Sequence, residues 1–226
     1  MTKINCVYFS PTGGTKAISK AIASAMAEKL KLPMVEIDLT LPWARNNPYN
    51  FAEDELVLVA APTYAGRIPN KILPELERLL HGSNSPTVCL SVYGGRSNDE
   101  GLRELVLLCE KNGFNVIAAS ACVARHSMSK VLAAHRPSDS DMQQYQHFGA
   151  LAAIKAENAP APVEIDRDTP IAPYYKPFKE DMSPASFLKA KPLTTDACID
   201  CGACAAACPL SSISFEDFRT DTRHIR

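Results

Sequence analysis

The sequence predicts an α/β protein built mainly on a doubly wound, five-stranded parallel sheet. Over residues 1–158, five short apolar segments alternate with helical patterns. Each segment is nearly continuously apolar, which is typical of parallel strands that helices cover on both faces. A proline-dense stretch and then a cysteine-rich segment follow. We therefore expect one ordinary domain and a smaller C-terminal unit.

Turn residues and helical repeats separate the five predicted strands. After the first strand, Ile18, Ile22, Met26 and Leu30 recur every four residues and form one apolar stripe, which indicates an amphipathic helix. The strands are expected at residues 4–9, 34–39, 55–61, 86–91 and 115–124. The later helices are expected at residues 71–81, 99–112 and 138–157.

The composition argues against several classes of function. With 46% hydrophobic and 22% charged residues, the chain resembles a soluble globular protein. The formal net charge of −1 and the absence of a lysine or arginine run argue against nucleic acid. No apolar run approaches the ~20 residues that span a bilayer. Eight cysteines without a signal-peptide pattern point to a reducing cytoplasm.

A proline-dense stretch connects the two units and holds seven of the 17 prolines. Helices and central strands do not tolerate that density, so we expect residues 159–192 to form an extended, fairly stiff connector. Its Tyr174, Tyr175 and Phe178 are able to pack back on the first domain. The second unit then comprises residues 193–226.

The loop between the first strand and the first helix has the features of a phosphate site. A helix start offers free backbone N–H groups and the positive end of the helix dipole, which together bind a phosphate. Glycine lets the backbone approach closely, and hydroxyl groups donate to phosphate oxygens without adding charge. The residues concerned are Ser10, Thr12, Gly13, Gly14 and Thr15. The alternative is an ordinary turn in which Thr15 caps the helix.

Two further loops follow the third and fourth predicted strands, and each contains a tyrosine, an arginine and glycine. In a sheet of order 2-1-3-4-5 these loops flank the switch point between strands one and three, where FMN binds. Their composition suits a flat isoalloxazine ring held between them. The first loop contributes Pro62, Thr63, Tyr64, Ala65, Gly66 and Arg67. The second contributes Ser91, Tyr93, Gly94, Gly95 and Arg96.

The aromatic and cationic residues of these loops have distinct expected roles. Tyr64 and Tyr93 are expected to form walls of the flavin site rather than plain packing at strand ends, because a buried tyrosine needs a polar outlet. Arg67 and Arg96, which alone would be solvated surface residues, are expected near the pyrimidine edge of the ring. A cation ~4 Å from that edge favours the anionic reduced flavin by up to a few kcal/mol.

Other polar residues near these loops have plainer interpretations. His126, which follows the fifth strand, is expected to be a structural histidine with satisfied hydrogen bonds. Glu100, Arg103 and Glu104 are expected to form the solvated face of a helix and no catalytic pair of carboxylates. None of these four residues therefore enters the predicted cofactor site.

Four cysteines near the C-terminus are spaced as C-x2-C-x2-C-x3-C, with Pro209 directly after them. This is the bacterial run that holds cubane iron–sulfur clusters. A zinc knuckle is the alternative, but zinc sites usually divide their ligands into two distant pairs. The predicted ligands of a 4Fe-4S cluster are Cys198, Cys201, Cys204 and Cys208.

The other cysteines do not form a second run of this kind. Cys6, Cys89, Cys109 and Cys122 lie in apolar stretches and are expected to be structural. In two-cluster ferredoxins the fourth cysteine of each run binds the other cluster, and no such run follows Cys208. We therefore expect the chain to be cut before a second motif and, as given, to hold little intact cluster.

Together these motifs resemble a known family. Residues 1–158 resemble flavodoxins, and the SPTGGT, APTYAGR, YGGR and ARHS segments are similar to those of flavodoxin–ferredoxin fusion proteins of anaerobic bacteria, often called the EFR1 family. The resemblance covers nearly the whole chain. It implies a flavodoxin-like fold, bound FMN, 4Fe-4S clusters, and redox partners such as a ferredoxin or an oxidoreductase. The chain departs from the pattern in lacking the second cysteine run.

The sequence favours an electron-transfer protein that passes electrons between 4Fe-4S clusters and FMN. A carrier needs no substrate pocket, and the sequence contains neither a dinucleotide fingerprint nor a catalytic dyad. One alternative is an FMN-dependent oxidoreductase that reduces a quinone, a nitro compound or a metal complex. Another is a redox-sensing module whose cluster is structural.

Overall fold

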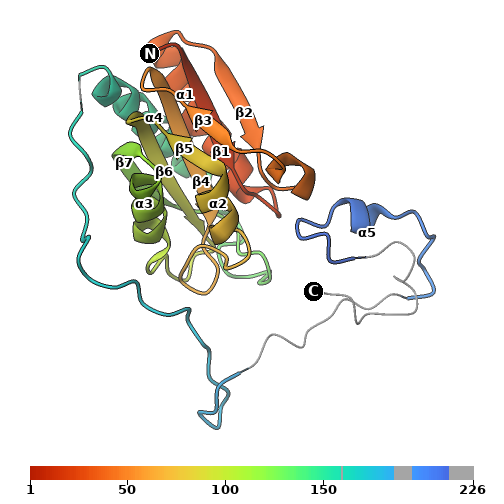
Figure 1. Cartoon of the computed structure of the whole chain (residues 1–226). Helices are drawn as coiled ribbons and strands as arrows, with labels where there is room; N and C mark the ends of the chain where they lie inside the picture. Colours follow the sequence, from red (N-terminus) through yellow and green to blue (C-terminus); the bar gives the residue numbers. More distant parts are fainter. Residues whose placement is uncertain (159, 186–194, 214–226) are drawn as a thin grey trace.

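One parallel sheet forms the centre of the first unit; the structure, a computed structural model, describes residues 1–158, 160–185 and 195–213 (Figure 1). The strands lie in the order β2-β1-β4-β6-β7, which is 2-1-3-4-5 when these five are numbered along the chain. This order confirms the predicted flavodoxin-like fold. The strands are β1 (Lys3–Tyr8), β2 (Met34–Asp38), β4 (Glu55–Pro62), β6 (Ser85–Tyr93) and β7 (Phe114–Val123).

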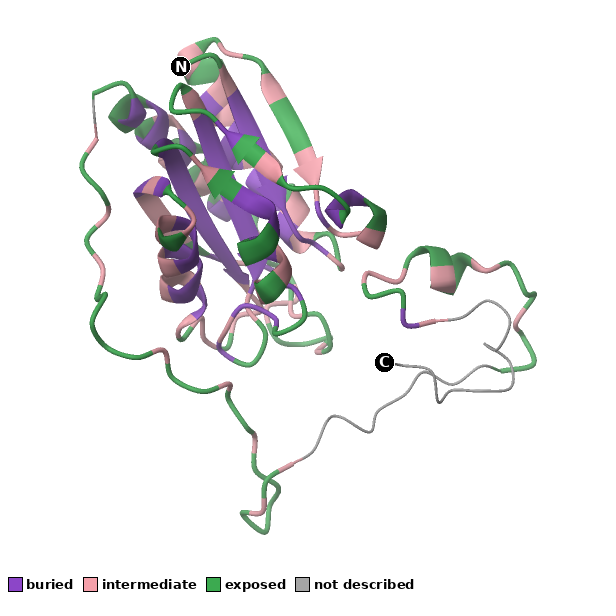
Figure 2. Cartoon of the chain, in the orientation of Figure 1, coloured by how far each residue is buried: buried purple, intermediate pink, exposed green. Residues whose placement is uncertain are grey.

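Two pairs of helices cover the two faces of this sheet, and the strands β1, β4 and β6 between them are buried almost throughout (Figure 2). Alternate residues of a strand point to opposite faces, so Leu58 of β4 belongs to one core and Val59 to the other. Helices α1 (Gly14–Leu30) and α4 (Asp139–Ala156) cover the first face, and α2 (Leu73–Leu79) and α3 (Gly101–Lys111) cover the second.

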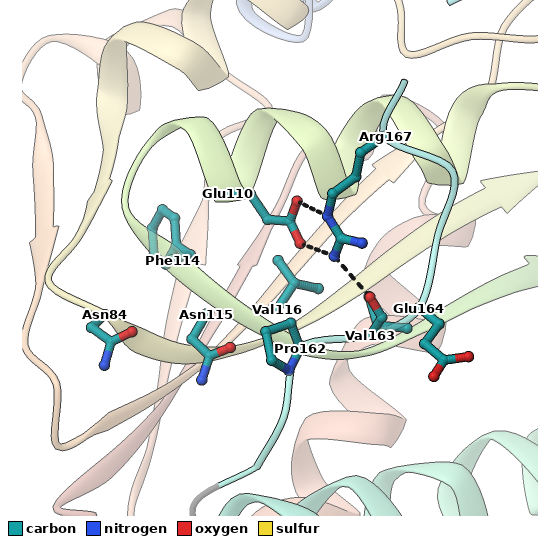
Figure 3. Close-up of a pocket in the computed structure, with 9 residues that line it drawn as sticks. All are labelled: Asn84, Glu110, Phe114, Asn115, Val116, Pro162, Val163, Glu164 and Arg167. Carbon is teal, nitrogen blue, oxygen red and sulfur yellow. Dashed lines mark hydrogen bonds and ion pairs between the residues drawn. The ribbon is translucent and has the colours of Figure 1, made fainter. Parts of the chain in front are cut away.

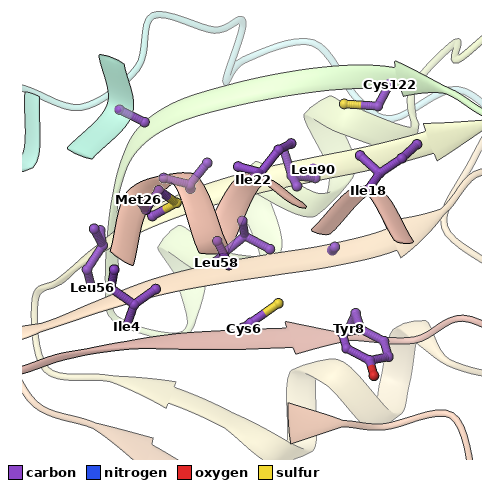
Figure 4. Packing of buried hydrophobic residues seen from close by; sticks show 14 of the residues in the cluster. Ile4, Cys6, Tyr8, Ile18, Ile22, Met26, Leu56, Leu58, Leu90 and Cys122 are labelled. Atoms are coloured by element: carbon purple, nitrogen blue, oxygen red, sulfur yellow. The ribbon is translucent and has the colours of Figure 1, made fainter. Parts of the chain in front are cut away.

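The predicted apolar stripe of α1 forms the middle of the first core (Figure 4). Ile18, Ile22 and Met26 are fully buried against the sheet, whereas Leu30, at the end of the helix, is only partly buried. Burying each such side chain contributes about 1.5–3 kcal/mol. The four-residue repeat therefore identified the face of α1 that binds the sheet.

The four upstream cysteines are buried, as predicted for structural residues. Burial raises the pKa of the Cys6 thiol to about 12 and that of the Cys122 thiol to about 11. Cys89 and Cys109 are also buried and free, and burial raises the pKa of Cys89 as well. All four side chains pack as small apolar groups.

Two short strands outside the main sheet were not predicted. They pair in parallel, so the helix expected at residues 71–81 ends at Leu79 and the chain continues as a strand. Pairing between segments about thirty residues apart leaves no local repeat in the sequence. The additional elements are the 3-10 helix η1 (Pro42–Arg45) and the strands β3 (Tyr49–Phe51) and β5 (Leu80–Gly82).

The described part of the C-terminal unit contains one short helix, α5 (Ala203–Ala206). It contains Cys204, the third cysteine of the run, and ends two residues before Cys208. Among the residues that the structure describes, no helix combines the length and the apolar character needed to cross a membrane.

The expectation of a solvated face at the start of α3 was wrong. Glu104 is only 6% exposed, because its carboxylate pairs with Arg67 from the loop after β4. The side chains of Glu100 and Arg103 form an ion pair at 2.7 Å and are also largely covered. Partners distant in the sequence bury these charges, and the helical pattern alone does not reveal them.

The connector lies against the first unit along α3 (Figure 3). The N–H of Val163 donates to the carbonyl of Val116 at 2.7 Å, and Arg167 binds both carboxylate oxygens of Glu110. Further along, the guanidinium of Arg103 donates to the Thr169 carbonyl at 2.6 Å. These contacts bind the connector to the first unit over much of the connector's described length.

We expect Gly149→Ala to destabilise the first unit by about 1–3 kcal/mol, measured by urea unfolding. A Cβ at Gly149 would lie 2.6 Å from the backbone carbonyl oxygen of Ile22, so α4 must move away from α1. Leu151→Ala, on the same helix but 52% exposed, is the control and should change stability by less than about 0.5 kcal/mol. Equal stability of Gly149→Ala and the parent would contradict this close helix contact.

Candidate functional site

The predicted loops meet at the carboxyl edge of the sheet. Thr63, just after β4, donates its N–H to the carbonyl of Val92 in β6 at 2.8 Å. A Cβ at Gly14 would lie 3.3 Å from that of Ala124, which follows β7. The start of α1 and the ends of β4, β6 and β7 therefore surround one region, as ligand sites of doubly wound sheets do.

The start of α1 leaves backbone donors free. Gly13, with φ of 85°, is the N-cap residue, and as a glycine it has no side chain with which to cap the helix. Thr15 lies inside the helix, so the alternative in which Thr15 is the cap is wrong. Instead, Ser10 Oγ accepts the N–H of Lys16 at 2.9 Å. Within the described part of the chain, the N–H groups of Gly14 and Thr15 have no acceptor.

The lysines near this loop are already paired with carboxylates. Lys20 Nζ lies 2.7 Å from Glu36, and Lys16 Nζ lies 3.3 Å from the same carboxylate. The hydroxyl of buried Tyr8 donates to Glu36 and, at 3.0 Å, to Asp38. Hydrogen bonds from Lys20 and Tyr8 lower the pKa of Glu36 to about 2. The donors that α1 itself offers to an anion are therefore neutral backbone N–H groups.

A partly buried cluster of three polar side chains joins the two predicted flavin loops. The Ser91 hydroxyl donates to Asn98 Oδ1 at 2.6 Å, and Thr63 Oγ1 lies 3.0 Å from the same oxygen. The Thr63 and Ser91 hydroxyls also bond to each other. These two residues thus hold the loops together. Asn98 was missed by the sequence analysis, although its place between the YGGR segment and α3 was a usable signal.

Arg67 is anchored by a buried ion pair. Its Nε lies 3.0 Å from Glu104 Oε1, and the other carboxylate oxygen accepts the N–H of Ile68 at 2.9 Å. The Glu104 carboxylate raises the pKa of Arg67. Buried charges are stable only when paired and hydrogen-bonded in this way. The pair fixes the loop after β4 to α3, with Tyr64 and Arg67 closing its turn through backbone hydrogen bonds.

The two predicted flavin-wall tyrosines lie at the rim of this edge. Tyr64 is 37% exposed, and burial of the rest of the residue raises its pKa. Tyr93, the last residue of β6, is half-buried. In the described residues neither hydroxyl has a hydrogen-bond partner. Nearby, Ala65 and Gly66 both have positive φ, and the Pro62 that begins the loop is buried.

The glycine loop after β6 packs against His126. A Cβ at Gly94 would lie 2.8 Å from the His126 ring, and Gly95 adopts a φ of 84°. His126 Nδ1 accepts the N–H groups of Met128 at 3.1 Å and Ser129 at 2.9 Å. His126 Nδ1 thus has backbone partners of the kind expected for a structural histidine. Arg96, next in the loop, pairs with Asp99 at 2.9 Å.

The cysteine segment has small residues and positive-φ turns between its thiols. Asp200 and Gly202 both adopt positive φ, and Cys201 and Cys204 are exposed. Burial alone would raise the pKa of Cys208, but backbone N–H groups, including that of Ser212 at 3.3 Å from Sγ, outweigh it and lower the pKa. Among the described residues, no three candidate ligand groups are gathered closely enough to hold a metal ion. Four thiols on a short chain of small residues nevertheless suit an iron–sulfur cluster.

Comparison with known proteins identifies the cysteine segment. Residues 192–214 match the family described as 4Fe-4S binding domain. No curated protein matches the chain. Because the family match covers only a short segment, it assigns that segment and not the whole chain.

Solved flavodoxin-type structures align with the first unit at low identity. A flavodoxin from the domain Archaea aligns over 70% of this chain and 100% of its own, with 18% identity and a TM-score of 0.46. The two-electron reduced flavodoxin of Megasphaera elsdenii aligns over 67% and 98%, with 15% identity and a TM-score of 0.43. The rubredoxin oxygen:oxidoreductase of the anaerobe Desulfovibrio gigas aligns over 70% and 38%, with 14% identity and a TM-score of 0.48. The fold assignment itself rests on the observed strand order.

We expect Glu104→Ala to destabilise the protein by about 3–5 kcal/mol in urea unfolding, because it leaves a largely buried Arg67 without its counter-charge. Glu104→Gln keeps an acceptor for the Ile68 N–H and should cost less. Glu77→Ala removes the exposed pair with Lys111 and should cost under about 1 kcal/mol. Similar small losses for Glu104→Ala and Glu77→Ala would contradict an anchoring role for the buried pair.

Proposed function

We propose that this chain is an electron-transfer protein that binds FMN within residues 1–158 and a 4Fe-4S cluster within residues 193–226. Electrons would pass between the two centres, which residues 159–192 join. The observation that carries the proposal is the presence, in one chain, of an uncapped helix start at the switch point of a flavodoxin-like sheet and a ferredoxin-type cysteine run. The resemblance to flavodoxin–ferredoxin fusion proteins supports a cytoplasmic carrier in an anaerobe, with a ferredoxin or an oxidoreductase as partner.

Neutral donors of the first loop would hold the FMN phosphate. The unpaired N–H groups of Gly14 and Thr15 lie at the start of α1, where the helix dipole favours an anion. Thr12 is exposed, and its hydroxyl is available beside them. Ser10 uses its oxygen to accept the N–H of Lys16, which leaves its O–H free to donate to phosphate.

The two glycine-containing loops would hold the isoalloxazine ring. Tyr64 and Tyr93, whose hydroxyls are unpaired in the described structure, would form the aromatic walls. Thr63 and Ser91 contribute indirectly, by binding each other and closing the gap between the loops. The remaining residues proposed to contact the flavin are Pro62, Ala65, Gly66, Arg67, Gly94, Gly95 and Arg96.

The cysteine run would supply thiolate ligands to iron. Cys198, Cys201 and Cys204 are spaced for three corners of one cubane, and Cys208 is the fourth thiolate of the run. Backbone N–H groups around Cys208 favour its thiolate form. When bound, FMN exchanges two electrons and a 4Fe-4S cluster exchanges one, so together they would connect one-electron and two-electron partners.

We expect the full chain to bind FMN at one site per chain and to bind riboflavin at least tenfold more weakly, because riboflavin lacks the phosphate. Thr12→Asp should weaken FMN binding at least tenfold by like-charge repulsion. Thr12→Asn is the matched control, because asparagine has nearly the same shape as aspartate but carries no charge. The measurement is titration by flavin fluorescence quenching. Equal affinities for riboflavin and FMN would contradict the phosphate site.

We expect Cys201→Ala to abolish intramolecular electron transfer while FMN binding is unchanged. Because the fourth cysteine of such a run serves a neighbouring cluster, the test uses the chain with a second C-x2-C-x2-C-x3-C-P run appended and clusters reconstituted without oxygen. Reduced ferredoxin should then reduce the bound FMN at a rate independent of protein concentration, measured by stopped-flow absorbance.

The neighbouring variant Ile199→Ala keeps every thiol and alters a side chain that is 82% exposed, so it should transfer electrons at the parent rate. If the bound FMN is reduced as fast in Cys201→Ala as in the parent, electrons do not reach the flavin through the cluster. An FMN-dependent oxidoreductase, reduced directly at its flavin, would then be the better description.

A further inference from the structure

The connector ends its contact with the first unit on the candidate flavin loops. The Tyr174 hydroxyl donates to the carbonyl of Ile68 at 2.7 Å, and its ring centre lies 4.5 Å from the Arg67 guanidinium carbon. Arg67 is thus covered by an aromatic ring from the connector while it pairs with Glu104.

The next residue contacts both loops. Tyr175 donates its N–H to the carbonyl of Ala65 at 2.8 Å, so its backbone is bound to the loop after β4. Its ring centre lies 4.1 Å from the guanidinium carbon of Arg96, in the loop after β6. The Tyr175 ring is partly open to solvent, so it is not a core residue.

The two tyrosines therefore connect the loops that the sequence analysis assigned to the flavin. The Tyr174 ring lies over Arg67 and the Tyr175 ring lies over Arg96. The N–H of the peptide that joins the two tyrosines bonds to Ala65, in the turn that begins at Tyr64. Glu100 adds a weaker link, since its carboxylate accepts the N–H of Ala172 at 3.4 Å. No other described segment bonds to the Ala65 carbonyl.

We propose that residues 163–175 are a strap that completes the flavin site, and that Tyr174 and Tyr175 are positioning residues for the loops on either side of the ring. This inference rests on the proposed FMN function. Loops that are ordered before the ligand arrives lose less conformational freedom on binding, so the strap increases affinity for the flavin. It also fixes the two arginine charges beside the site.

The test is FMN affinity in the full chain, measured by fluorescence quenching for three variants. Tyr175→Ala removes the ring over Arg96 and should weaken binding about tenfold, equivalent to ~1.4 kcal/mol. Tyr175→Phe keeps the ring and should restore affinity to within about twofold of the parent. Phe178→Ala removes an aromatic ring that is 58% exposed in the same connector, and it should have no effect.

Two results would overturn the strap: unchanged affinity in Tyr175→Ala, or tighter binding, which would mean that the connector obstructs the flavin. Loss of affinity in Tyr175→Phe equal to that in Tyr175→Ala would also overturn the role given to the ring. Circular dichroism confirms that each variant is folded before titration.

Hydrogen exchange of the flavin-free protein separates this inference from the FMN assignment. Backbone amides of Tyr64 and Arg67 should exchange about tenfold faster in Tyr174→Ala than in the parent or Tyr175→Phe, since the loop after β4 has lost the ring over Arg67 and the hydroxyl bound to the Ile68 carbonyl. Equal exchange in all three overturns the strap. If the exchange rates differ as expected but the parent binds no FMN, the flavin function is overturned and the strap remains only a structural brace.

Discussion

The parallel sheet, buried on both faces, determines where chemistry can occur in the first unit. A parallel strand is joined to the next by a crossover that returns the chain to the same starting edge. The crossover helices α2 and α3 cover one face here, and α1 with the final helix α4 covers the other. The adjacent residues Leu58 and Val59 point to opposite faces of the sheet, and both are fully buried. Both cores are built mainly from apolar side chains, so the polar groups open to a ligand lie where the strands end. At the carboxyl edge, one helix start and several loops meet.

Charge at that edge is held in pairs. Lys16 and Lys20 are paired with Glu36, and Arg67 is paired with buried Glu104. Each pair restrains a loop or strand end as well as balancing a charge. The donors that α1 itself leaves free at this edge are neutral backbone N–H groups. A site of this kind binds a phosphate through direction and dipole, so its affinity depends less on ionic strength than that of a lysine cluster would.

Local patterns predicted those features that depend on residues close together in the chain. Ile18, Ile22 and Met26 identified the buried face of α1, and the continuous apolar strands gave the sheet, because hydrophobic repeats follow directly from helix and strand geometry. The burial of Glu104 and the cluster around Asn98 escaped prediction because their partners lie in other loops. The possible return of Tyr174 and Tyr175 to the first domain was foreseen from their aromatic character, but composition could not say which residues they would meet.

The path of the connector bears on how two redox centres in one chain would communicate. Near its start, the Pro160 carbonyl accepts a hydrogen bond from Asn115, the second residue of β7, at the amino edge of the sheet. By Tyr175 it has reached Ala65, at the opposite, carboxyl edge. The chain therefore leaves the first unit beside the candidate flavin site and not from the end of α4. A tether that begins at the cofactor edge raises the local concentration of whatever follows it at that edge, which is the geometry that rapid transfer between a flavin and a cluster requires. On this proposal the segment up to Tyr175 would order the loops of the flavin site and bring the chain to the cofactor edge.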